Sequence, residues 1–134
     1  MNLKVISHSS KKKISDNTDI YLVDTFGETR KFYNLTNVAF IGGSIINHGG
    51  QNPLEAVRAG NYIVNGPNIN NFKEIYSYLK KKKISFTTRS MRKMEKIVLK
   101  KINKKLPKSD REKILINGDK ILKKNIFFIN KYLK

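Results

Sequence analysis

The sequence of 134 residues has no cysteine, few acidic residues and no long apolar run. The lack of cysteine excludes disulfide bonds and metal sites built from thiolates. No apolar stretch approaches the roughly 20 residues of a membrane-spanning helix, and the amino terminus has none of signal-peptide length. A chain of this size is typical of one domain, and a cytoplasmic location is the expectation that these absences leave.

The charge balance is strongly positive, because 28 lysines and arginines stand against 10 acidic residues, for a formal net charge of +18. The excess lies in residues 77–134, which hold 20 basic and four acidic groups, whereas residues 16–76 hold four basic and six acidic groups. A basic segment of this kind is typical of proteins that bind nucleic acid or an anionic membrane. A genome rich in A and T, which favours lysine, isoleucine and asparagine codons, would give a similar composition without such a partner.

Apolar runs rich in β-branched residues alternate with helical patterns through residue 88. This alternation predicts a Rossmann-like α/β fold, with a parallel sheet of about five strands and helices on both faces. The run at 20–25 is almost continuously apolar, which predicts a strand covered on both faces. The expected strands are 3–7, 20–25, 38–43, 62–64 and 84–88, and the expected helices are 29–36, 53–59 and 71–83.

Helical patterns continue after Ser90 to the end of the sequence. We therefore expect residues 1–88 to form the α/β part of one domain and residues 89–134 to complete it with basic helices. The last helix, at 121–133, is apolar around most of its circumference and is expected to pack on this domain or on another one. The four lysines at 80–83 suit the carboxyl end of a helix dipole, and contact with an anionic membrane is the alternative.

Right-handed crossovers place the strand-to-helix loops of such a sheet along one edge. Ligands of open α/β folds bind at that edge, beyond the carboxyl ends of the strands. The loops concerned here are 26–28, 42–52 and 65–71, and each carries glycine or asparagine. The second loop is the richest in glycine, with Gly42, Gly43, Gly49 and Gly50.

The glycine-rich loop leads into the short helix expected at 53–59. Asn52 suits the N-cap and Pro53 the first helical position. Glu55 falls at the position where, in a capping box, its side chain would accept a hydrogen bond from the Asn52 amide. Capping explains these three residues without a ligand. The glycine pairs are typical of a backbone that a ligand approaches closely, and free helix amides bind phosphate. The residues alone therefore predict a phosphate or nucleotide site.

Several stretches of the chain match the motifs of one known family. They read D-T-F-G-E at 24–28, A-F-I-G-G-S at 39–44, G-G-Q-N-P-L-E at 49–55, G-P at 66–67 and N-F at 71–72. With this spacing, residues 19–76 resemble the carboxyl-terminal half of the 3-deoxy-D-manno-octulosonic acid (Kdo) transferases of lipid A assembly. Gln51 stands where the family commonly has histidine, and Ala56 stands where it commonly has proline.

The resemblance implies a glycosyltransferase of the two-domain GT-B architecture, whose second domain binds the donor CMP-Kdo in lipopolysaccharide biosynthesis. Phe26, Gly27 and Glu28 would lie against the nucleotide, near its base. The helix amides that follow Asn52 would hold the phosphate, and Glu55 would hold the ribose. The CMP-binding residues that the resemblance implies are Phe26, Gly27, Glu28, Asn52, Pro53, Leu54 and Glu55.

The family keeps its catalytic base and its site for the lipid A precursor in an amino-terminal domain that has no counterpart in this sequence. The resemblance therefore implies a donor-binding fragment, or one subunit of a split enzyme, that is inactive alone and peripheral to the cytoplasmic face of the inner membrane. No cofactor and no catalytic residue are expected in the chain itself. No metal site is expected either, because His8 and His48 have no partner at metal-ligand spacing.

Two alternatives to a Kdo transferase remain open at this point. A basic nucleic-acid-binding protein fits the lysine-rich residues 77–134 but gives the glycine-rich loop no role. A degenerate, non-catalytic remnant of the transferase would keep the same motifs.

Overall fold

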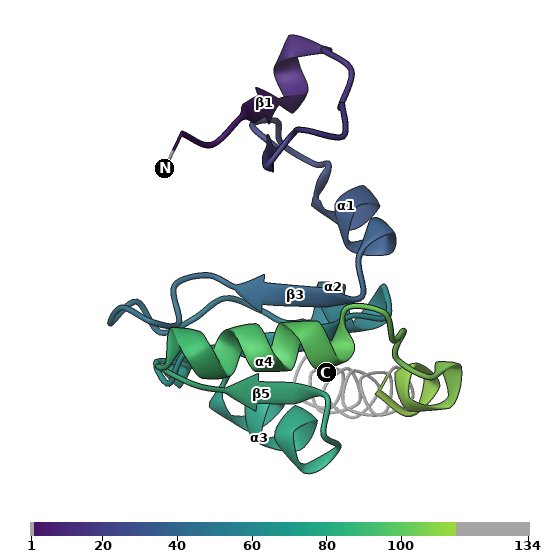
Figure 1. Cartoon of the computed structure of the whole chain (residues 1–134). Helices are drawn as coiled ribbons and strands as arrows, with labels where there is room; N and C mark the ends of the chain where they lie inside the picture. Colours follow the sequence, from purple (N-terminus) through teal and green to yellow (C-terminus); the bar gives the residue numbers. More distant parts are fainter. Residues whose placement is uncertain (1, 115–134) are drawn as a thin grey trace, which may run out of the picture. The chain divides into compact units, whose positions relative to one another are not determined.

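The computed structural model describes residues 2–114, so the helix predicted at 121–133 lies outside the described residues. The chain divides into two compact units, Met1–Phe32 and Tyr33–Lys134, and the division falls within helix α1 (Thr29–Leu35) (Figure 1). Within the described residues, no helix is both long enough and apolar enough to cross a bilayer.

The first unit contains a small parallel sheet of two strands. Strands β1 (Val5–Ser7) and β2 (Ile20–Leu22) pair with Val5 opposite Ile20, and the 3-10 helix η1 (His8–Ser10) follows β1 directly. No residue among 2–32 is buried, and the Ile20 and Leu22 side chains are 41% and 51% exposed. The prediction that this strand is covered on both faces was therefore wrong, because two strands of three residues enclose too little volume for a core.

The second unit is built on a parallel sheet of three strands. Strands β3 (Val38–Ile41), β4 (Tyr62–Asn65) and β5 (Ser85–Thr87) lie in the order β3-β4-β5. Ala39 and Ile63 are partners across the first pair of strands, and Ile63 is the partner of Ser85 across the second. The predicted parallel α/β fold is confirmed. The five strands form two sheets rather than one sheet of about five, since β1 pairs with β2 alone within the described residues.

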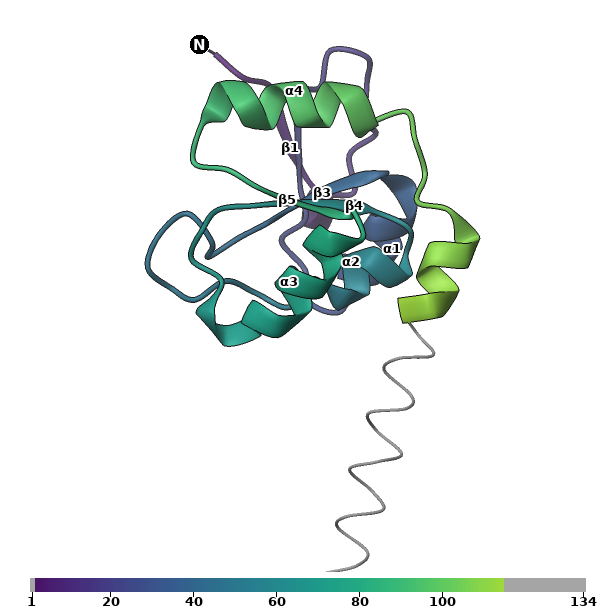
Figure 2. The same ribbon diagram turned by 90° about the horizontal axis from the view of Figure 1, so that it is seen from below.

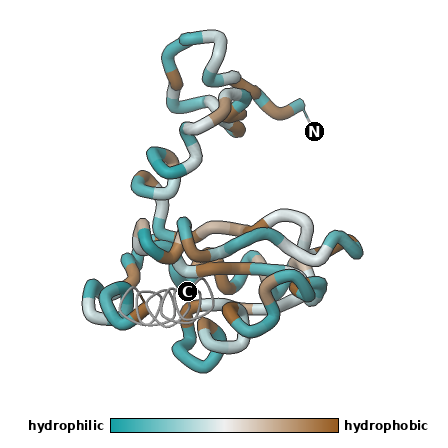
Figure 3. The backbone as a smooth tube through the Cα atoms, turned by 180° about the vertical axis from the view of Figure 1, so that it is seen from behind, coloured by the Kyte–Doolittle hydropathy of each residue, from teal (hydrophilic) through white to brown (hydrophobic). Residues whose placement is uncertain are grey.

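One face of the three-stranded sheet carries the hydrophobic core. Helix α2 (Leu54–Arg58) and helix α3 (Lys73–Lys81), which follows the 3-10 helix η2 (Asn70–Phe72), contribute to this core. Hydrophobic segments, brown in Figure 3, run along these strands. The buried core residues of this cluster are Ala39, Ile41, Ala56, Val57, Ile63, Tyr76, Leu79, Ile84, Leu106 and Ile114.

Helix α4 (Met91–Lys101) lies on the opposite face of the same sheet, so that helices cover both faces as predicted (Figure 2). Its N-cap is Ser90, whose hydroxyl oxygen accepts a hydrogen bond from the Lys93 amide at 3.3 Å. Near the other end, the Lys101 ammonium lies 3.9 Å from the centre of the Tyr62 ring and 5.4 Å from that of Phe86. This cation–π contact links α4 to strands β4 and β5.

Candidate nucleotide-binding site

The glycine-rich loop of the second unit follows β3 and is fastened to the loop that follows β4. Ser44 is fully buried; its hydroxyl donates to the Ile41 carbonyl at 2.6 Å and accepts from the Gly66 amide at 2.9 Å. The Asn68 amide donates to the Ser44 carbonyl at 2.9 Å. Buried polar groups are satisfied in this way, and the carboxyl-terminal edge of the sheet is therefore shaped by two interlocked loops.

The glycines of this loop meet needs of the fold itself. Gly43, Gly49 and Gly50 have φ values of +68°, +84° and +73°, which side chains rarely tolerate. The Gly50 amide donates to the Gly43 carbonyl at 3.0 Å, and this hydrogen bond closes the loop. At Gly42 the backbone is ordinary and a β-carbon would meet no atom within 4 Å. Three of the four glycines thus have a structural reason that the sequence pattern did not reveal, and Gly42 alone faces open space.

Helix α2 begins one residue later than predicted, because Pro53 and not Asn52 is its N-cap and Leu54 is its first residue. The Asn52 side-chain oxygen accepts a hydrogen bond from the Leu54 amide at 3.0 Å, and Pro53, which is buried, lies between them. Leu54 packs against the hydrophobic core. Pro53 and Leu54 therefore have a clear packing role, whereas the exposed Asn52 is accessible to a ligand.

Glu55 points a free carboxylate out of the first turn of α2. The side chain is exposed, and within residues 2–114 it has no hydrogen-bond or ion-pair partner. The predicted capping box, in which this carboxylate accepts a hydrogen bond from the Asn52 amide, is therefore not formed. The negative charge acts at a distance on Tyr33, whose pKa is raised by burial and, to a smaller extent, by Glu55. An unpartnered carboxylate is an available acceptor for ligand hydroxyl groups.

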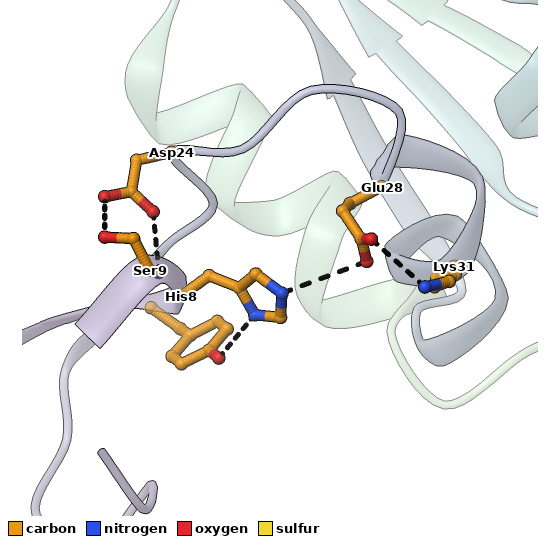
Figure 4. A network of polar contacts seen from close by, with 6 residues as sticks. His8, Ser9, Asp24, Glu28 and Lys31 are labelled. Carbon is orange, nitrogen blue, oxygen red and sulfur yellow. Dashed lines mark hydrogen bonds and ion pairs between the residues drawn. The ribbon is translucent and has the colours of Figure 1, made fainter. Parts of the chain in front are cut away.

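The first unit holds the other three predicted site residues in the turn after β2. The Phe26 side chain is 104% exposed, and Gly27 adopts a φ of +81°. Glu28 accepts a hydrogen bond from the Lys31 ammonium at 3.1 Å, and its carboxylate lies 3.8 Å from Nε2 of His8 (Figure 4). This contact could not be predicted from the sequence, since His8 and Glu28 are 20 positions apart and belong to no shared motif.

Asp24 stabilises the segment that carries His8. Its carboxylate accepts hydrogen bonds from the Ser9 amide at 2.9 Å and from the Ser9 hydroxyl at 2.5 Å (Figure 4). These bonds, with a small contribution from the charge of His8, lower the pKa of Asp24 below its usual value. The aspartate of the D-T-F-G-E motif thus has a structural partner in η1.

The structure places Phe26, Gly27 and Glu28 in the first unit and residues 52–55 in the second. The groups able to contact a ligand are the exposed Phe26 ring, the Asn52 amide group and the carboxylates of Glu28 and Glu55. Within residues 2–114 there is no cluster of three histidine or acidic side chains that could hold a metal ion. These side chains can form hydrogen bonds with hydroxyl and amino groups of a ligand and can stack on its aromatic rings.

A parallel sheet with its glycine-rich loop at the carboxyl ends of the strands defines the second unit as a Rossmann-like domain. Its likeness to known proteins is specific. A solved structure, the C-terminal CMP-Kdo-binding domain of WaaA from Acinetobacter baumannii, matches with a TM-score of 0.68 and 30% sequence identity, over 72% of this chain and 51% of that one. No protein-family model matches the chain.

Curated relatives show the same resemblance in sequence. The chain is 36% identical over 74 residues to a 3-deoxy-D-manno-octulosonic acid transferase of Haemophilus influenzae, which is 55% of this chain and 17% of that protein. It is 45% identical over 56 residues to the transferase of Bordetella pertussis, which is 42% of this chain and 13% of that protein. The chain therefore resembles the carboxyl-terminal part of the Kdo transferases, as the motifs indicated, and it spans a minor part of their length.

Proposed function

We propose that this chain binds the donor CMP-Kdo and is the donor-binding part of a glycosyltransferase that transfers Kdo to a lipid A precursor in lipopolysaccharide biosynthesis. The observation that carries this proposal is the match to the CMP-Kdo-binding domain of WaaA, at 30% identity and a TM-score of 0.68. The acceptor and the general base would come from an acceptor-binding part of the enzyme.

The proposed contacts of the nucleotide follow from the groups that the two units leave accessible. Glu55 would accept hydrogen bonds from the ribose hydroxyls, since its carboxylate has no other partner among the described residues. Asn52 and the amides of α2 that follow Leu54 would bind the phosphate, since the Leu54 amide donates to the Asn52 side chain. Phe26 and Glu28 would contact the base, the first by stacking and the second through its carboxylate. Gly27, Pro53 and Leu54 would shape the backbone beside these groups.

The test is CMP binding to the purified chain, followed in amide NMR spectra and by calorimetry. Signals of Gly27, Glu28, Asn52 and Glu55 are expected to move, and signals of the lysine-rich residues 77–114 are not. Movement confined to the lysine-rich residues would identify a general attraction for anions and would contradict the proposal. AMP and UMP, which carry the same phosphate, test whether the base is recognised.

Glu55→Gln is the sharpest variant for this site. The substitution keeps the size of the side chain and weakens a carboxylate that accepts from the ribose. We expect the dissociation constant for CMP to rise about tenfold, the size of a hydrogen bond to a charged group. Glu95→Gln, which makes the same change at an exposed position of α4, is the matched control and should bind as the wild type does. Unchanged binding by Glu55→Gln would remove Glu55 from the site.

We also propose a peripheral position at the cytoplasmic face of the inner membrane, with α4 as the contact to anionic lipid. Arg92, Lys96 and Lys100 are exposed at four-residue spacing on one face of this helix, and Leu99 beside them is 67% exposed. Basic and apolar side chains together suit a lipid surface. The chain should sediment with vesicles that contain phosphatidylglycerol and not with neutral ones. Equal binding to an oligonucleotide would favour a general polyanion effect.

A further inference from the structure

The Glu28 carboxylate is flanked by two groups that can carry positive charge. Lys31, one turn along α1, donates a hydrogen bond at 3.1 Å, and His8 from η1 places Nε2 at 3.8 Å (Figure 4). The Glu28 side chain is only 25% exposed. Because 3.8 Å is too long for a hydrogen bond, His8 acts on Glu28 through its charge and its bulk.

His8 is itself held in one orientation. Its Nδ1 lies 2.8 Å from the Tyr21 hydroxyl, and its ring makes edge-on contacts with the rings of Tyr21 and Phe32, at centre distances of 5.8 and 5.4 Å. When the imidazole is neutral and Tyr21 donates to Nδ1, the remaining ring proton lies on Nε2. When the imidazole is protonated, both nitrogens carry a proton. In both states an N–H group lies on the Glu28 side of the ring.

We propose that His8 is a positioning residue for Glu28, held in place by Tyr21, and that together with Lys31 it keeps the carboxylate in the conformation that binds the nucleotide. This inference rests on the proposed function, in which Glu28 contacts CMP. A side chain that is already ordered loses less conformational entropy when a ligand binds. The hydrogen bonds between Ser9 and Asp24 complete the arrangement, because they fix η1 next to the end of β2.

The charged and titratable groups around His8 are few, which makes its effect measurable. They are Tyr21 on β2, Asp24 after β2, Glu28 just before α1, and Lys31 in the first turn of α1. Protonation of His8 adds a full positive charge beside the Glu28 carboxylate. A protonated His8 should therefore contribute more to nucleotide binding than a neutral one.

The experiment measures CMP binding to the full chain and to three variants. His8→Phe keeps the ring packing against Phe32 and removes the nitrogens, and we expect the dissociation constant to rise about two- to fivefold, the range of exposed ion pairs. His8→Gln keeps an N–H donor and should recover part of this loss at high pH. Lys12→Gln, a change at an exposed position of the same unit outside the proposed site, is the control and should leave the constant unchanged. Amide NMR spectra check that each variant is folded.

The ratio of the wild-type and His8→Gln affinities is then followed with pH, because titration of the CMP phosphate cancels in this ratio. A ratio that grows as the pH falls supports positioning by charge, whereas packing alone leaves it flat. If the wild type binds CMP and His8→Phe binds equally well, the inference about His8 is wrong and the proposed function stands. If the wild type shows no CMP binding, both are overturned.

Discussion

Gly66 lies so close to Ser44 that a β-carbon at position 66 would overlap the Ser44 carbonyl oxygen. The Gly66 amide also donates to the Ser44 hydroxyl at 2.9 Å. The loops after β3 and β4 therefore meet backbone to backbone at the carboxyl end of the sheet. Neither loop can move at this point without displacing the other.

The first prediction concerns this contact. Gly66→Ala should lower the free energy of unfolding by about 1–3 kcal/mol, as expected when an added methyl group forces a packed backbone apart. Gly42→Ala is the matched control, because its β-carbon meets open space and its φ lies outside the left-handed region, and it should stay within about 0.5 kcal/mol of the wild type. Urea unfolding of both variants measures the difference. Equal stabilities would contradict the close approach seen here.

The second prediction is an alkaline loss of stability caused by Tyr76. Burial raises the pKa of this phenol from 10.0 to about 12, and its hydroxyl donates to the Gln51 carbonyl at 2.8 Å. The folded state therefore favours the protonated form. Its contribution is complete below the unfolded pKa of 10.0 and is lost as the pH rises toward about 12.

Tyr76→Phe isolates this effect from the titration of lysines, which the two proteins share. At neutral pH the wild type should be more stable by about 1 kcal/mol, the value of one hydrogen bond. This advantage should shrink above about pH 10 and disappear as the pH approaches the raised pKa. Urea unfolding across the alkaline range follows it. An advantage that is independent of pH would show that Tyr76 ionises equally in the folded and unfolded chains.

A third prediction concerns the cation–π contact between α4 and the sheet. Burial lowers the pKa of Lys101, and the charges of Lys104 and Lys100 add to this effect. The charged form of Lys101 is therefore less favourable in the folded chain than in water. The Tyr62 ring at 3.9 Å offsets this effect. Lys101→Gln should therefore destabilise the chain by about 0.5–1 kcal/mol more than Lys100→Gln, where the same charge is lost at an exposed position of the same helix. Thermal unfolding of the two variants provides the comparison.

The fourth prediction concerns catalysis. The chain alone, supplied with CMP-Kdo and a lipid A precursor, should give no transfer, because a general base must lie within hydrogen-bond reach of the acceptor hydroxyl. The sequence match to the Haemophilus influenzae transferase covers 17% of that protein, which leaves most of its length without a counterpart in the match. Transfer that appears only when an acceptor-binding part is added would identify a split enzyme. Robust transfer by the chain alone would mean that its own residues include the base.

The second unit was largely predictable from its sequence, for local reasons. Asn52 and Pro53 mark the start of α2, and Gly60, with a φ of +96°, follows its end. The apolar runs that became β3 and β4 are buried on the core face at Ala39, Ile41 and Ile63. These signals lie within a few residues of the structure that they specify.

The first unit was less predictable, because its features depend on what surrounds it. The apolar run of β2 indicated burial, but the burial of a strand depends on the elements that cover it and not on its own sequence. The contact between His8 and Glu28 joins positions that no short motif connects, and only the pairing of β1 with β2 brings them together. Candidate ligand groups could be named from the sequence, whereas the residues that support them could not.

The absence of buried side chains among residues 2–32 has an energetic consequence for ligand binding. A segment with so few buried apolar contacts opens locally at small free-energy cost. A nucleotide that contacts Phe26 and Glu28 would then stabilise the folded form of residues 2–32 by mass action. The heat of binding would include the heat of local folding, and the heat-capacity change would be more negative than burial of the nucleotide alone produces. The affinity for a nucleotide bound in this way would thus depend on the free energy needed to order residues 2–32.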